Sequence, residues 1–141
     1  MGGAKMAHAI QDERMVFTMD FGNQDPWGYP RLKLAGGERP LPGADGIAID
    51  VQVLEGKGAL RVQFLEDGGS AYLGELPYNF TKGGRQTLTA FFNKANWGGH
   101  SRPDTDGKLT PAEIGGLMIG INAQKNSRVR FAISNARWVK Y

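Results

Sequence analysis

The chain has 141 residues, 40% of them hydrophobic and 22% charged, which is enough for one buried core and leaves no room for a second domain. Lysines and arginines number 17 against 14 aspartates and glutamates, and these charges are scattered, so the sequence offers no basic track for nucleic acid. Zero cysteines exclude disulfides and thiolate sites, and no run approaches the roughly 18–20 apolar residues of a membrane span.

The first part of the chain predicts an arm followed by short strands. Residues 1–14 are expected to form an N-terminal arm, frayed or paired with a neighbouring strand. An opening strand is predicted over Met15 to Phe21, and another over Tyr29 to Leu34. The clearest strand runs from Ile47 to Val53, where branched apolar residues at every second position predict one buried face.

A hairpin follows this strand. Leu60 to Leu65 alternates apolar with polar residues and ends at Asp67-Gly68-Gly69-Ser70, a typical turn composition. The returning strand, Ala71 to Tyr78, carries Tyr72 and Leu73 on opposite faces. The loop length decides which of the two points inward, because a slip of one residue exchanges the faces.

The second half of the chain predicts four more strands and one helical turn. The strands are expected over residues 87–92, 117–121, 128–134 and 137–141, which makes about eight or nine in all, the number typical of a sandwich or barrel. The turn is expected over Thr110 to Gly115, with the threonine as its cap and a proline at its first position. One of Phe91 and Phe92 must face outward, and Trp138 is expected to pack in the core or at a sheet edge.

Several of these elements together resemble the galactose-binding-like jelly roll of carbohydrate-binding modules, near families 11 and 30. The chain carries Asp-Phe-Gly followed by Trp-Gly, then Gly-Ile-Ala-Ile-Asp-Val, Leu-Glu-Asp-Gly-Gly, Thr-Leu-Thr-Ala-Phe-Phe and Asp-Gly-Lys-Leu-Thr-Pro-Ala-Glu-Ile. The similarity spans residues 15–141. It implies an all-β, two-sheet antiparallel jelly-roll sandwich with one helical turn near residues 110–115.

The resemblance also implies a function. Such modules lay a glycan across a concave sheet face without transforming it, with plant or algal β-glucan as the favoured ligand class. They are tethered to a catalytic domain and secreted, so we expect this chain in an extracellular or periplasmic setting. We also expect it to be a monomer, with no nucleic-acid or membrane partner. A protein-interaction domain is the alternative, because a group of complex I assembly factors that binds no sugar shares the fold.

Aromatic rings stack on the C–H face of a sugar, and polar side chains replace the water around its hydroxyls. The predicted contacts are residues off the core face of strands and in loops: Trp27, Tyr29, Arg61, Gln63, Tyr72, Trp97, His100, Arg102 and Asn122. Trp27 could instead cover the core as a lid, and Trp97 could pack under its own loop. Arg61 and Gln63 could equally belong to an ordinary solvated strand face.

Metal-binding and catalytic hypotheses have less support in the sequence. Arg102 to Glu113 has the spacing of an EF-hand loop, but the arginine stands where a carboxylate is needed, so no metal site or cofactor is predicted there. A structural calcium elsewhere, bound by Asp20, Asp25 or backbone carbonyls, is the remaining metal hypothesis. A small hydrolase or lyase is the third hypothesis, for which His100 with Asp104 or Asp106 is the pair to test.

Overall fold

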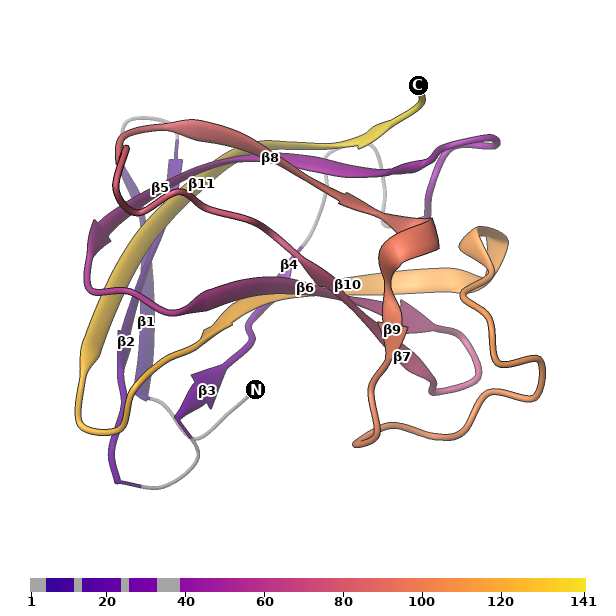
Figure 1. The fold of residues 1–141 in the computed structure, drawn as a ribbon, viewed down its shortest axis with the longest axis horizontal. Coiled ribbons are helices and arrows are strands. Elements are labelled where there is room, and N and C mark those ends of the chain that lie inside the picture. The colour runs from indigo at the N-terminus through magenta and orange to yellow at the C-terminus, as the bar shows by residue number, and fades with distance from the viewer. Residues whose placement is uncertain (1–4, 12–13, 24–25, 33–38) are drawn as a thin grey trace.

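The computed structural model describes residues 5–11, 14–23, 26–32 and 39–141, which form two antiparallel β-sheets (Figure 1). The first sheet has five strands in the order β1-β2-β11-β5-β8. They are β1 (Lys5–Gln11), β2 (Arg14–Asp20), β5 (Gly46–Glu55), β8 (Gln86–Phe91) and β11 (Arg128–Val139).

The second sheet has six strands, in the order β3-β10-β6-β7-β9 with β4 also paired to β10. They are β3 (Trp27–Gly28), β4 (Arg31–Leu32), β6 (Ala59–Glu66), β7 (Ala71–Glu75), β9 (Asn96–Trp97) and β10 (Ile114–Asn122). Two 3₁₀ turns, η1 (Phe92–Lys94) and η2 (Pro111–Glu113), are the only helices in the described part of the chain, and neither could cross a bilayer.

The core lies between the two sheets and is built from alternating apolar side chains. The predicted inward faces are confirmed: the side chains are buried at Ile47, Ile49, Val51, Leu60, Val62, Phe64, Leu117, Ile119, Ile121, Val129, Phe131 and Ile133. Because one face of each sheet is apolar, the two layers must pack together. The predicted all-β jelly-roll sandwich is therefore confirmed.

Two aromatic positions left open by the sequence are now placed. Phe92 is buried and its ring meets that of Phe64 edge-on at 5.2 Å, whereas Phe91 faces outward on β8 beside Tyr141. Trp138 is half-buried against the core, as predicted, with its ring 6.0 Å from that of Phe92.

The strand boundaries differ from the prediction at several places. Part of the predicted arm is an edge strand, since β1 pairs with β2 along its whole length while all its residues stay exposed. β3, β4 and β9 are two-residue pairings, short because proline and glycine interrupt the ladder around them. Residues 33 and 34 of the strand predicted from Tyr29 lie outside the described residues.

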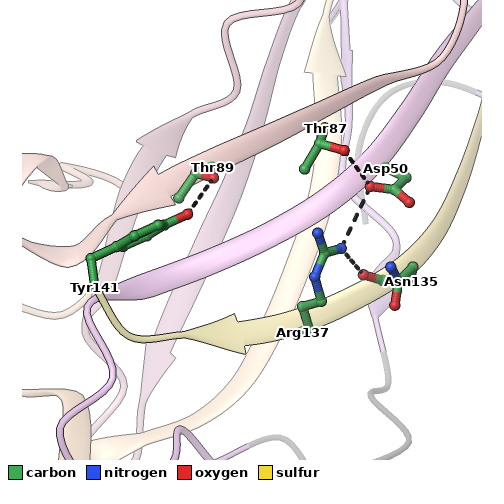
Figure 2. Close-up of polar contacts among 6 residues, drawn as sticks. All are labelled: Asp50, Thr87, Thr89, Asn135, Arg137 and Tyr141. Atoms are coloured by element: carbon green, nitrogen blue, oxygen red, sulfur yellow. Dashed lines mark hydrogen bonds and ion pairs between the residues drawn. The ribbon is translucent and has the colours of Figure 1, made fainter.

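The two strands predicted at the C-terminal end are one strand, β11, with a bulge. The register with β5 shifts between Ser134 and Arg137, and Asn135 adopts a left-handed φ of 52° that asparagine tolerates. Arg137 Nη1 donates to the Asn135 carbonyl at 2.6 Å and lies 3.5 Å from Asp50, which also accepts from the Thr87 hydroxyl at 2.8 Å (Figure 2). This network links β8, β5 and β11 across the bulge.

The predicted helical turn is present at η2, with Pro111 at its start, but its predicted cap is wrong. The Thr110 side chain makes no capping hydrogen bond. Its hydroxyl lies 3.3 Å from the Asp106 carboxylate, and its backbone N–H donates to Glu66 at 2.9 Å.

Candidate functional site

A cleft of about 300 Å³ lies on the outer face of the six-stranded sheet. Its lining is aromatic and polar, with one aliphatic side chain: Trp27, Tyr29, Arg61, Gln63, Leu73, His100 and Asn122. The volume falls at the lower end of the range for small-molecule pockets, about 300–1,000 Å³. The cleft can therefore hold a small ring rather than a large cofactor.

The pleat of the sheet explains why these residues meet. Gln63 lies opposite Leu73 in the β6–β7 pairing, and Asn122 lies opposite Trp27 in the β10–β3 pairing. Side chains of paired residues share one face, and their neighbours Phe64 and Ile121 point into the core. The buried apolar face thus fixes which polar residues point outward.

Tyr29 forms part of the cleft because Gly120 leaves room beneath it. A Cβ at Gly120 would overlap the carbonyl oxygen of Gly28 and lie 2.7 Å from the Tyr29 ring. The bare glycine lets the β3 backbone and this ring lie directly on β10. Only 4% of Tyr29 is exposed, so it acts as the floor of the cleft rather than as a rim.

The Tyr29 hydroxyl is held by two polar neighbours. It donates to Asn122 Oδ1 at 2.6 Å and accepts a hydrogen bond from Arg61. Burial raises the pKa of Tyr29 above its usual value, although the positive charge of Arg61 offsets part of the shift. The phenol is therefore neutral, and the three side chains form a fixed polar floor.

His100 closes one side of the cleft from the loop after β9. Its Nε2 lies 3.2 Å from Gln63 Oε1, and because an amide oxygen only accepts, the ring nitrogen donates. The ring folds back over Gly98, where a Cβ would lie 2.6 Å from His100 Cε1. The loop is tied to the β6–β7 hairpin by Ser101, whose Oγ accepts from Ala71 N–H at 2.9 Å.

Three of the predicted contact residues are not brought to this cleft. Tyr72 faces the core and is 2% exposed, so of the two faces left open by the sequence it takes the inner one. Trp97 pairs with Tyr72 and so shares its side of the sheet; its indole N–H donates to the Arg102 carbonyl at 3.2 Å. Arg102 lies against Gly69 at the hairpin turn.

The acidic side chains of this region form a separate cluster at the end of the sandwich. Tyr72 donates to Asp104 at 2.6 Å, and Asp104 in turn interacts with the buried Glu66. Burial raises the pKa of Glu66 to about 7, reinforced by the negative charge of Asp104 and Glu113 against the hydrogen bond from Thr110. The Tyr72 bond holds the pKa of Asp104 below its usual value.

These contacts bear on the catalytic pair and the metal sites that were considered from the sequence. His100 bonds to Gln63, whereas Asp104 is engaged with Tyr72, so the structure does not bring that histidine and aspartate together. Within residues 5–11, 14–23, 26–32 and 39–141, no three histidine or acidic side chains converge on a possible metal. Asp20 pairs with Arg128 at 2.8 Å, and Asp25 lies outside the described residues.

Sequence reasoning missed Leu73 and the two glycines that shape the cleft. Leu73 could have been found if the hairpin register were known, because it faces Gln63. Gly98 and Gly120 could not have been singled out from the sequence, because the chain contains 21 glycines. A side chain is excluded at these two positions only because of the rings and backbone that pack against them in the folded structure.

Comparison with known proteins identifies related folds. No protein-family model and no curated protein matches the sequence. A family 11 carbohydrate-binding module from Clostridium thermocellum, solved with a β-1,3-1,4-mixed-linked tetrasaccharide, matches with a TM-score of 0.72 and 14% identity over 98% of this chain and 84% of that one. The family 11 module of a cellulosomal cellulase from the same organism gives 0.71 at 10% identity, over 99% and 83% of the two chains.

An agarase also contains this fold, with a TM-score of 0.62 and 11% identity over 99% of this chain but 24% of the agarase. The jelly-roll fold of family 11 carbohydrate-binding modules is thus shared by this chain, which confirms the resemblance predicted from the sequence.

Proposed function

We propose that this chain is a non-catalytic carbohydrate-binding module whose ligand occupies the cleft between Trp27 and His100. The observation that carries the proposal is the composition of that cleft. A half-buried indole stands beside the polar side chains of Arg61, Gln63 and Asn122, all within this one cleft. An aromatic face with adjacent hydrogen-bonding groups is what a sugar ring requires, because the ring has an apolar face and a polar rim.

The lack of a carboxylate pair among the described cleft residues supports binding without glycoside hydrolysis. Glycoside hydrolysis needs two carboxyl groups on either side of the bond that breaks. No carboxylate is among the described residues that line the cleft. Glu66 and Asp104, the acidic pair in this part of the fold, are engaged with each other and with Tyr72 away from the cleft.

The structural neighbours suggest a biological setting for the module. Two are carbohydrate-binding modules, one of them from a cellulosomal cellulase, and the fold also forms a minor part of an agarase. We therefore place this chain beside a catalytic domain, in an extracellular or periplasmic protein, and expect it to act as a monomer. Plant and algal β-glucans, favoured by the resemblance, are the first polymers to test.

Affinity electrophoresis against soluble polysaccharides tests the proposal. We expect micromolar to millimolar binding to at least one polymer, lowered about tenfold or more by Trp27→Ala because the stacking face is lost. Trp97→Ala is the matched control, since that exposed indole points away from the cleft.

The proposal fails if no polysaccharide retards the wild-type chain, or if Trp97→Ala abolishes binding while Trp27→Ala keeps it. Circular dichroism and thermal melting must show that both variants remain folded. A wild-type chain that ignores every glycan would favour the protein-interaction alternative.

A further inference from the structure

The cleft presents many hydrogen-bond donors, and each of its oxygen acceptors already receives one hydrogen bond. The Tyr29 oxygen accepts from Arg61, Asn122 Oδ1 accepts from Tyr29 at 2.6 Å, and Gln63 Oε1 accepts from His100 at 3.2 Å. The remaining guanidinium N–H groups of Arg61 and the amide NH₂ groups of Asn122 and Gln63 are left to face a ligand. Each of these groups can only donate.

Arg61 also brings a positive charge that forms no ion pair with a carboxylate among the described residues. The ion pairs there join Arg39 to Asp67, Arg128 to Asp20 and Arg137 to Asp50. Glu75 lies opposite Arg61 in the β6–β7 register but forms no ion pair with it. A half-buried guanidinium with spare donors is a strong partner for an anion, because charge-assisted bonds are stronger than neutral ones.

A neutral sugar is a poor match for the hydrogen-bond donors of the cleft. Each hydroxyl both donates and accepts, whereas the side chains around the cleft offer more donors than acceptors, so a neutral ring would match them only in part. A carboxylate or sulfate oxygen only accepts, which matches a donor-rich floor. The aromatic wall at Trp27 still requires a ring with an apolar face.

We infer that the cleft selects an acidic glycan, with the carboxylate or sulfate of a sugar ring on Arg61 and the ring against Trp27. This inference rests on the proposed function and narrows it. The inferred ligand therefore differs from the mixed-linked tetrasaccharide solved with one structural neighbour, because that tetrasaccharide is neutral.

Matched polymers that differ in charge test the inference. Polygalacturonate is compared with highly methyl-esterified pectin, κ-carrageenan with agarose, and both pairs with mixed-linkage β-glucan, by affinity electrophoresis and calorimetry. We expect the acidic member of at least one pair to bind about tenfold or more tightly than its neutral partner, with affinity falling as salt rises. The pectin pair reports on a carboxylate, and the carrageenan pair on a sulfate.

Variants separate a specific contact from general attraction of charge. Arg61→Gln should lower affinity for the acidic polymer about tenfold or more, and Arg61→Lys should restore part of it. Arg85→Gln removes the same charge from an exposed position outside the cleft and should leave binding unchanged. Thermal melting checks that the Arg61 variants remain folded.

The possible results are distinct. Equal or tighter binding of the neutral member of each pair, or equal loss in the Arg61 and Arg85 variants, overturns the inference while glycan binding still stands. No binding to any of the five polymers overturns the inference, and the proposed function falls with it if no other polysaccharide retards the chain in affinity electrophoresis.

Discussion

Single residues set the shape of the cleft, and Gly120 is the most constrained of them. Its missing side chain is what allows Gly28 and Tyr29 to lie against β10. Gly68, in the β6–β7 turn, has no heavy atom within 4 Å of an added Cβ, so it offers a control for the same chemical change.

We predict that Gly120→Ala displaces β3 and lowers glycan affinity by about tenfold or more. The added methyl group must push the Gly28 backbone away, which moves Tyr29 and the neighbouring Trp27, and overpacking of this kind costs about 1–3 kcal/mol of stability. Gly68→Ala should change neither quantity. Calorimetry with a bound polymer and urea unfolding measure the two effects, and unaltered affinity in Gly120→Ala would contradict this role for the glycine.

The sequence predicts residue faces well where apolar residues alternate on both sides of a position. Arg61 and Gln63 could be predicted to face outward because Leu60, Val62 and Phe64 alternate with them. Tyr72 could not be placed, since its strand follows a turn whose length fixes the register. Binding by the predicted contact residues stays a prediction.

At the scale of elements, the long loop between β9 and β10 carries His100 to the cleft and is anchored at its far end by the acidic cluster. The Thr110 N–H donates to Glu66, and Asp104 accepts from Tyr72. Because Glu66 is buried with a pKa near 7, it is protonated in slightly acidic solution and must ionise inside the fold as the pH rises.

We predict that the chain becomes less stable between about pH 5 and pH 8. Between the ordinary carboxyl pKa of 4.5 and the native pKa of about 7, the native state holds a proton on Glu66 that the unfolded state has released, so stability falls until the native carboxyl has ionised as well. Glu66→Gln, which cannot ionise, should remove a fall of about 2 kcal/mol. Urea unfolding at the two pH values measures it, with exposed Glu75→Gln as control; an unchanged slope in Glu66→Gln would exclude this origin.

The ends of the strands were harder to predict than which of their residues point inward. The inward residues of β11 follow a simple alternation, yet its continuation to Val139 depends on a bulge at Asn135 that is supported by Arg137 and Asp50. The two-residue strands β3 and β9 are likewise defined by their partners rather than by their own composition.

Across the whole molecule, the cleft draws on segments far apart in the chain. Trp27 comes from β3, Arg61 from β6, His100 from the loop after β9 and Asn122 from the end of β10. The sandwich brings these segments together by burying the opposite face of the same sheet. An all-β sandwich or barrel could therefore be predicted from alternation, and its jelly-roll type from the resemblance, whereas the grouping of the cleft residues required the strand order of the sheet.

The most direct test of this account is an NMR titration of the chain with ¹⁵N-labelled tryptophan, which gives one indole signal for each of its three tryptophans. On adding a glycan that binds, we expect the Trp27 indole signal to shift while those of Trp97 and Trp138, which lie outside the cleft, stay in place. A Trp27 signal that is unmoved at saturation, or a shift confined to Trp97, would contradict the assignment of this cleft as the carbohydrate site.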